Sequence, residues 1–184
     1  MHERHRALAT AFALAVLGGP AVASAQGGLY VGGGLGPAVR IDDLPTQIRL
    51  EQEVGYYVEG RPAGFFVGFA PSQSFGADYW LLTFAPRFGY MFELYRTNDL
   101  SFQLGPTGTI PGIAVGNFFD GNRDADVYFH FSLSLGLRLL LDGGRIALYL
   151  RPVEFEFAFG NGHPPWGDDS GIRYVLQGGV HFHF

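Results

Sequence analysis

Apolar or small residues occupy every second position of the last thirteen residues, from Ile172 to Phe184. The positions between them are mostly polar, beginning with Arg173 and ending with His183. Successive side chains of a β-strand point to opposite faces, so this spacing predicts a strand with one apolar and one polar face. Such a strand needs partner strands elsewhere in the chain.

The same alternation predicts seven further strands, at residues 28–39, 47–58, 63–70, 78–93, 100–110, 127–141 and 146–159. The clearest is 127–141, where Phe and Leu alternate with Ser, His, Gly and Arg. In 146–159 the alternation changes phase at Arg151 and Pro152, as a β-bulge would produce. Phe66 leaves the facing of 63–70 open.

The connections alternate in length. Short turns are predicted at 59–62, 96–99 and 142–144, and longer loops at 41–46, 71–77, 111–126 and 160–171. Short turns at one end and longer loops at the other are typical of an up-and-down membrane barrel.

Both soluble and membrane barrels show alternation, so the two faces must be assigned from their chemistry. A water-facing surface is normally rich in charged residues, yet the chain has no Lys and the strand 28–39 offers mainly glycine. We therefore expect the Leu and Phe face to meet lipid. The sequence predicts an all-β fold, an eight-stranded antiparallel up-and-down transmembrane β-barrel.

Residues 1–25 have the features of a secretory signal peptide: Arg4 and Arg6, an apolar run, and the small residues Ala23-Ser-Ala25. Removing 25 residues from the 184 leaves 159, which fits one barrel domain, residues 26–184. The chain has no cysteine, so an exported protein does without disulfides. These features predict localisation to the outer membrane.

Charged residues on the polar faces are predicted to lie in the lumen. In a narrow interior of low dielectric, charges are costly unless paired, and Arg pairs with carboxylates in a bidentate manner. The predicted lumen ion-pair network comprises Arg49, Glu51, Glu53, Arg87, Arg138, Arg151, Glu154, Glu156 and Arg173. Whether it closes the lumen or acts as a gate stays open. Acidic residues outnumber the arginines of the mature chain, which argues against nucleic acid as a partner.

With the signal peptide, eight strands, short turns and the closing Tyr174…Phe182-His-Phe184, the chain resembles the small outer-membrane β-barrel family that includes the OmpA transmembrane domain, OmpX and OmpW. The resemblance implies that Tyr174, Phe182 and Phe184 form a C-terminal signal for the outer-membrane assembly machinery. It also implies contact with outer-membrane lipid and lipopolysaccharide, a monomer, and no cofactor. Aromatic residues at strand ends are candidates for interfacial girdles; they are Trp80, Tyr90, Phe92, Tyr95, Phe182 and Phe184.

The resemblance favours a non-enzymatic structural or surface role, with a passive route for small hydrophobic molecules as an alternative. A second alternative is a lipid A-modifying enzyme, because His130 and Ser132 have a spacing similar to that of the barrel lipid A deacylases. The catalytic pair of those enzymes faces lipid. Residues 120–126 resemble the start of a calcium loop but lack its glycine and its final acid. His181 and His183 share a face without an evident third ligand, so we expect no metal site.

Overall fold

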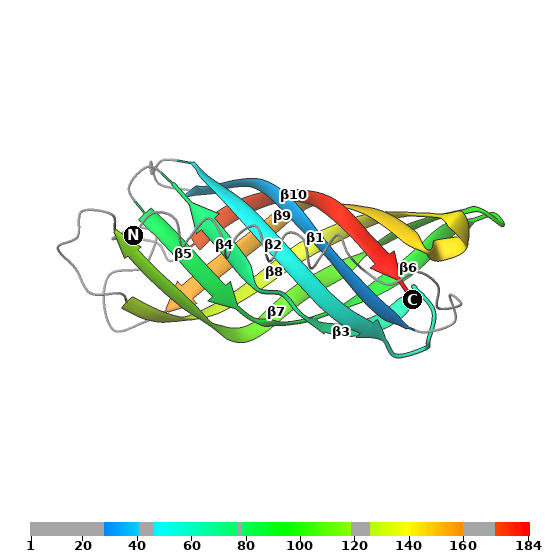
Figure 1. The fold of residues 1–184 in the computed structure, drawn as a ribbon, viewed down its shortest axis with the longest axis horizontal. Helices are drawn as coiled ribbons and strands as arrows, with labels where there is room; N and C mark the ends of the chain where they lie inside the picture. Colours follow the sequence, from blue (N-terminus) through cyan, green and yellow to red (C-terminus); the bar gives the residue numbers. More distant parts are fainter. Residues whose placement is uncertain (1–27, 41–45, 77–78, 119–125, 160–171) are drawn as a thin grey trace, which may run out of the picture.

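In the computed structural model, the described residues are 28–40, 46–76, 79–118, 126–159 and 172–184 (Figure 1). The predicted signal peptide and residues 120–125 of the possible calcium loop lie outside them. Ten strand segments and one short 3-10 helix follow each other along the chain. Their bounds are β1 Leu29–Arg40, β2 Gln47–Tyr57, β3 Gly64–Phe69, β4 Ser72–Phe75, β5 Tyr79–Phe84, β6 Pro86–Arg96, β7 Leu100–Phe118, β8 Asp126–Leu141, η1 Asp142–Gly144, β9 Ile146–Phe159 and β10 Ile172–His183.

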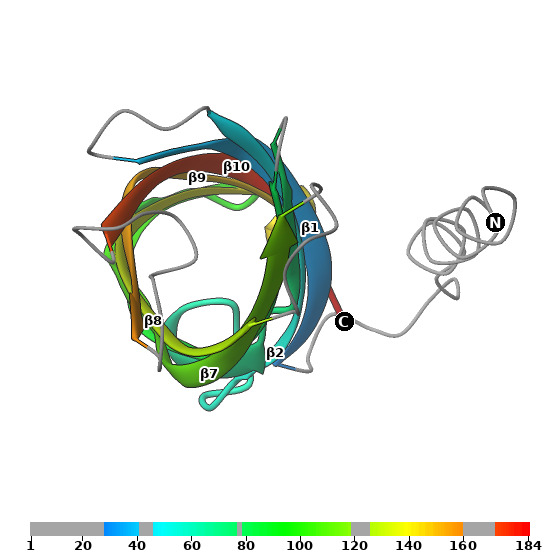
Figure 2. The same ribbon diagram turned by 90° about the vertical axis from the view of Figure 1, so that its left-hand side faces the viewer.

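The strands form one closed antiparallel ring. Apart from β3 with β4 and β5 with β6, each strand pairs with its neighbour in sequence, and β1 also pairs with β10, which closes the sheet on itself. β3 with β4, and β5 with β6, each act as one barrel strand interrupted beside a proline. The fold is therefore the predicted eight-stranded up-and-down barrel, and Figure 2 shows its ring from the loop end.

Two predicted loops are shorter than expected. Ser72–Phe75 was predicted to lie in a loop because Pro71 and Gly76 flank it, but it is strand β4, hydrogen-bonded to β2 and β5. The sequence also predicts that the strand beginning at residue 100 ends at Ile110, before Pro111. β7 instead continues to Phe118, because a register shift between Thr109 and Gly112 accommodates the proline within the ladder.

The phase slip predicted in the strand 146–159 is confirmed. β9 carries one residue more than β10 between Arg151 and Glu154, and its register against β8 shifts at the same place. The bulge keeps Arg151 and Glu154 on the inner face although they are three residues apart. The closing strand β10 pairs with the glycine-rich first strand β1, with Gly32 opposite His181 and Gly34 opposite Gly179.

The outer face of the ring is apolar. Leu35, Ile48, Phe129 and Leu133 are each more than half exposed, and large apolar side chains are exposed on every wall. The inner face holds buried polar and aromatic side chains, and it includes Phe66, which settles the facing of β3. Aliphatic residues that face outward with polar residues inward are the arrangement expected of a barrel surrounded by lipid. Among the described residues, no helix is both long and apolar enough to cross a membrane.

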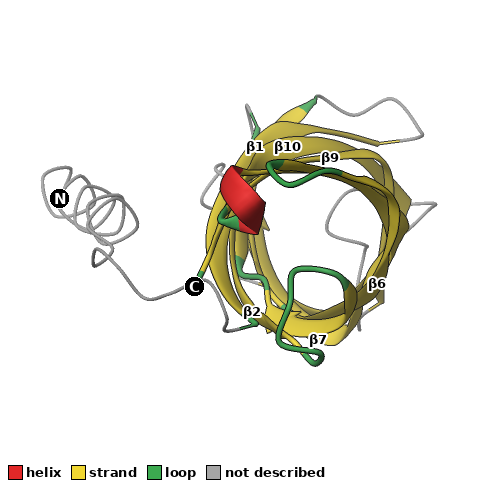
Figure 3. Cartoon of the chain, turned by 90° about the vertical axis from the view of Figure 1, so that its right-hand side faces the viewer, coloured by secondary structure: helices red, strands yellow, loops and turns green. Residues whose placement is uncertain are grey.

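The short connections lie together at one end of the barrel, with the C-terminus beside them (Figure 3). The connection between β2 and β3 curves across the mouth at this turn end. Gln103 Nε2 holds it there by donating a 2.7 Å hydrogen bond to the Pro62 carbonyl oxygen. Gly60 within the connection and Gly64 at the start of β3 have φ of 69° and 82°, values that glycine adopts readily.

Candidate functional site

All nine charged residues predicted for the lumen are buried inside the barrel, each with at most 3% of its surface exposed. β2 supplies three and β9 supplies three, because alternate residues of one strand point inward. β6, β8 and β10 supply one each. All of them except Arg138 join in one ion-pair network between the walls of the barrel.

Glu51 is at the centre of the ion-pair network. Arg87 binds it through both Nη atoms at 2.8 Å each, in a bidentate pair. Arg49 donates a 2.7 Å hydrogen bond and Arg151 a 2.6 Å hydrogen bond to the same carboxylate. Three guanidinium groups from β2, β6 and β9 therefore share one buried carboxylate. Arg suits this position because its planar group presents several donors in fixed directions.

Glu53 links the centre to the turn end. It accepts hydrogen bonds from Arg151 Nη2 and from the Tyr30 hydroxyl, both at 2.6 Å. Arg87 Nη1 lies 3.2 Å from the carboxylate and His181 Nε2 lies 3.5 Å from it. The contacts of Glu53 join β2 to β1, β6, β9 and β10, so the carboxylate ties five strands together.

Glu156 organises the loop side. Arg49 and Arg173 both pair with it, and Arg173 Nε donates to it at 2.7 Å. His130 Nε2 lies 3.3 Å from the same carboxylate. Arg173 also donates a 2.6 Å hydrogen bond to the Gln47 side chain. The alternation places Gln47 on the inner face of β2, but its part in the network follows only from the register between walls.

Glu154 is held more loosely. Arg49, Arg87 and Arg151 approach it at 3.5, 3.7 and 3.7 Å. Within the described part of the chain, neither oxygen of Glu154 has a hydrogen bond. Its main contribution is therefore negative charge between three cations. A carboxylate that accepts hydrogen bonds from its arginines is held more tightly than one that only lies near them.

Arg138 has a different environment from the other eight residues, and the prediction that it belongs to the ion-pair network is wrong. It forms no ion pair with any carboxylate of the described residues. Its guanidinium lies over the rings of Phe66, Tyr57 and Tyr30, at 5.0, 5.4 and 5.6 Å from their centroids. Cation–π attraction replaces the expected carboxylate. Alternation put Arg138 on the correct face, but the three rings come from β1, β2 and β3, and their proximity required the barrel geometry.

Three layers follow each other along the lumen. The turn end holds Tyr30, Tyr57, Phe66 and Met91, which pack together around Arg138. The middle holds the ion pairs described above. The loop side holds a small apolar cluster in which Tyr128 packs with Leu81 and two alanines. The buried side chains of the inner face thus form three layers of different chemistry along the lumen.

The candidate catalytic pair lies inside the barrel. His130 and Ser132 are both buried on the inner face of β8. The Ser132 hydroxyl accepts a 3.2 Å hydrogen bond from Thr109, and His130 lies beside Glu156. A lipid substrate approaching from the membrane would meet the other face of this strand.

The two closing histidines are also buried. His181 and His183 pack against Tyr30 with tilted rings whose centroids are 5.0 and 5.7 Å away. Among the described residues, no group of three or more His, Cys, Asp and Glu side chains is placed to hold a metal ion. The histidines pack in the aromatic layer at the turn end.

The proposed assembly-signal residues lie on the outer face of β10 or at its end. Phe182 is 44% exposed, and the Tyr174 hydroxyl hydrogen-bonds the Pro152 carbonyl beside the β9 bulge. The backbone N–H of Phe184 donates a 2.9 Å hydrogen bond to Leu29 and so ties the chain end to β1. Their recognition by an assembly machinery stays a prediction.

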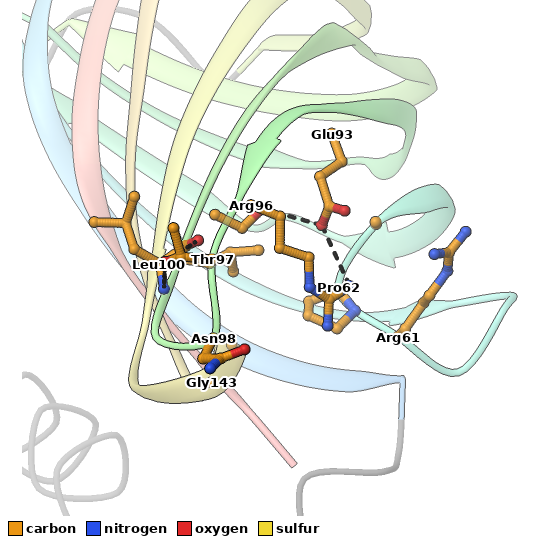
Figure 4. A pocket seen from close by; sticks show the side chains of 12 residues that line it. Arg61, Pro62, Glu93, Arg96, Thr97, Asn98, Leu100 and Gly143 are labelled. Atoms are coloured by element: carbon orange, nitrogen blue, oxygen red, sulfur yellow. Dashed lines mark hydrogen bonds and ion pairs between the residues drawn. The ribbon is translucent and has the colours of Figure 1, made fainter.

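A small cavity of about 90 Å³ opens at the turn end (Figure 4). Its charged residues pair with each other: Glu93 accepts a 3.1 Å hydrogen bond from Ser101 and lies 3.6 Å from Arg96. Arg61 at the rim donates two hydrogen bonds to Glu59, which raise the pKa of Arg61. These local pairs account for the charges at this mouth.

No family model matches the chain, and no curated protein matches it. Among solved structures, the chain is similar to the crystal structure of Neisserial surface protein A (NspA), with a TM-score of 0.58 and 12% sequence identity, over 85% of this chain and 97% of that one. The N-terminal β-barrel domain of Pseudomonas aeruginosa OprF also matches, with a TM-score of 0.47 and 12% identity, over 84% of this chain and 97% of that one. The chain therefore has the fold of the small outer-membrane β-barrels. At this identity, the likeness concerns the fold alone.

Proposed function

We propose that this chain is a non-enzymatic integral outer-membrane β-barrel with a structural or surface role in the Gram-negative envelope. The observation that carries the proposal is the buried network of arginines and glutamates across the middle of the lumen. The apolar outer face and the fold shared with NspA support a location in the outer membrane.

The way the network is built supports a closed interior. Glu51 binds three guanidinium groups that come from β2, β6 and β9, and Glu156 ties β10 to β2. A solute crossing the barrel would have to separate buried charges whose remaining partners would stay unpaired. Breaking one buried pair typically costs 3–5 kcal/mol. We therefore favour a closed lumen over a gate.

The enzyme alternative is disfavoured by the facing of its candidate residues. Nucleophilic catalysis requires the activated pair to reach its substrate. Here Ser132 hydrogen-bonds Thr109 inside the barrel, away from the lipid that a lipid A-modifying enzyme would act on.

The passive-route alternative has one supporting observation, the apolar cluster of Leu81, Ala114, Tyr128 and Ala158 on the loop side of the lumen. The charged layer lies directly beneath this cluster. A hydrophobic molecule entering from the loop end would therefore need a lateral exit through the wall.

Flux through lipid vesicles tests the proposal. We expect vesicles that contain the folded wild-type chain to release small ions and a small hydrophobic dye no faster than empty vesicles. A charge-balanced variant, Glu51→Ala with Glu53→Ala, Arg87→Ala and Arg151→Ala, should increase ion release, because it removes the central side chains without changing the net charge. Circular dichroism verifies that both chains are folded. Rapid release of either probe by the wild type would contradict a closed structural barrel.

Lipid A composition provides the second test. Expression of the wild type should leave lipid A acylation unchanged. Loss of an acyl chain that depends on His130 would establish the enzyme alternative in place of the present proposal.

A further inference from the structure

Two glutamines interrupt the apolar outer face of the barrel. Gln52 on β2 lies between the exposed Leu50 and Val54, and Gln73 on β4 lies between the buried Ser72 and Ser74. Alternation therefore points both amides outward, and both side chains are half-buried there. In the central part of the outer face, no other described strand residue carries a side-chain amide.

Gln52 lies near the middle of the membrane-spanning length. It is the sixth of the eleven residues of β2, and crossing a bilayer takes about 9–11 strand residues. Ile48 and Leu50 continue the apolar face on its loop side, and Val54 and Tyr56 on its turn side. Gln73 pairs in register with Leu50, which makes it the diagonal neighbour of Gln52 on the adjacent strand.

Neither amide has a hydrogen-bond partner in the described barrel. The residue beside Gln52 on β1 is Gly33, which has no side chain, and on the other side the Gln52 backbone N–H bonds the Pro71 carbonyl. Hydrocarbon chains offer no donor or acceptor, so polar groups placed there are costly until another molecule satisfies them.

We propose that the outer face around Gln52 and Gln73 is a self-association surface that binds a second copy of this chain. Lipid headgroups lie at the membrane surfaces, so a partner at mid-depth with donors and acceptors is a protein. Two copies inserted in one membrane have the same orientation. A two-fold axis along the membrane normal therefore brings this surface onto its own copy, with glutamines at like depth.

Amide chemistry favours this self-pairing. Each glutamine side chain both donates and accepts hydrogen bonds, so two identical surfaces are complementary. Phe69 and Phe75, which are 42% and 47% exposed on the same barrel strand, add apolar contact around the polar pair. The proposal departs from the monomer expected from the sequence, and it is independent of whether the lumen is closed.

Single cysteines test the proposal directly, because the chain has none of its own. Val54→Cys places a thiol beside Gln52 on the outer face of β2. Leu135→Cys places the matched control on β8, which lies four barrel strands away in either direction around the ring. Each variant is incorporated at low density in phosphatidylcholine vesicles and treated with a short thiol cross-linker. The proposal predicts a covalent dimer at Val54→Cys in clear excess over Leu135→Cys.

A second comparison isolates the amides. Gln52→Leu with Gln73→Leu, added to Val54→Cys, keeps side-chain size but removes the polar groups. Hydrogen bonds between membrane segments contribute modestly, so we expect the dimer yield to fall about tenfold. Circular dichroism should remain unchanged. Equal dimer yields on the two walls would overturn the proposal, as would a yield that is insensitive to loss of both amides. The comparison of the two walls needs no leucine variant, so it stands even if that variant folds poorly.

Discussion

At the residue scale, Glu51 and Glu154 differ in how they hold their cations, although both are buried and both lie among three arginines. Glu51 hydrogen-bonds its arginines at 2.6–2.8 Å, whereas those nearest Glu154 stay at 3.5 Å or beyond. We expect Glu51→Gln to lower the free energy of unfolding by roughly 3–5 kcal/mol. Glu154→Gln, the matched control, should cost clearly less. Urea unfolding in detergent measures both, and equal losses would mean that the hydrogen bonds add little to the charge.

Arg138 provides a second comparison among buried cations. Because it faces aromatic rings and no carboxylate of the described residues, Arg138→Met should leave no anion unpaired. We expect it to be neutral or stabilising by about 1 kcal/mol, since replacing a buried charge by an apolar side chain removes a desolvation cost. Arg87→Met should destabilise the barrel by several kcal/mol, because it strips Glu51 and Glu53 of a shared donor. The same unfolding assay compares them. A large loss at Arg138 would show that the cation–π contacts exceed the desolvation cost.

At the element scale, β8 tests which face meets lipid. Leu135 points outward and is 42% exposed, while the adjacent Ser134 hydrogen-bonds Thr107 inside the barrel. Leu135→Arg should reduce insertion into vesicles strongly, because an outward Arg near the bilayer midplane costs about 2–4 kcal/mol. Ser134→Arg should be tolerated better, since its register partner on β9 is Glu154. Equal insertion of the two variants, measured by protease protection, would reverse the facing.

The bulge in β9 makes a prediction about deletions. Removing Pro152 leaves Arg151 and Glu154 two positions apart, which restores strict alternation with both charges inward. We therefore expect the deleted chain to insert and fold. Removing Leu137 from β8, which has no extra residue, would turn either Leu135 or Arg138 to the wrong face and should abolish insertion. Failure of the Pro152 deletion alone would assign the proline a role in folding beyond the bulge.

The alternation of apolar and polar residues predicted the barrel, but it could not predict which side chains contact each other in the lumen. Period two placed Glu51, Arg87 and Arg151 on inner faces, since each strand carries that information locally. Their convergence depends on the register between β2, β6 and β9, which no single strand specifies. Arg138 shows this limit most clearly. The balance of Arg and Glu on the inner faces predicted a carboxylate partner for it, but the register of the strands places three aromatic rings around its guanidinium. The strand at 72–75 was not predicted because its flanking residues, Pro71 and Gly76, are typical of loops. What makes it a strand is its pairing with β2 and β5, which the local sequence does not show.

At the scale of the whole molecule, the barrel closes at the seam between β1 and β10, where glycines of the two strands face each other. Gly179 of β10 pairs with Gly34 of β1, and a Cβ at Gly179 would collide with the Gly33 carbonyl oxygen and press on the Tyr149 ring. The neighbouring Gly178 faces outward, where a Cβ would meet nothing closer than 3.6 Å. The first and last strands can therefore approach closely only if the inner position carries no side chain.

Adjacent leucine substitutions on β10 test this closure. We expect Gly179→Leu to lower the free energy of unfolding by at least about 1–3 kcal/mol, the usual cost of overpacking, and to reduce the closed fraction of the barrel. Gly178→Leu adds the same volume on the lipid side and should leave both nearly unchanged. Hydrogen exchange reports the closure directly at the amides that β1 and β10 direct toward each other, because these N–H groups lose their partners when the ring opens. Equal protection of these amides in the two variants would contradict this explanation. It would mean that the barrel can close with a large side chain at position 179.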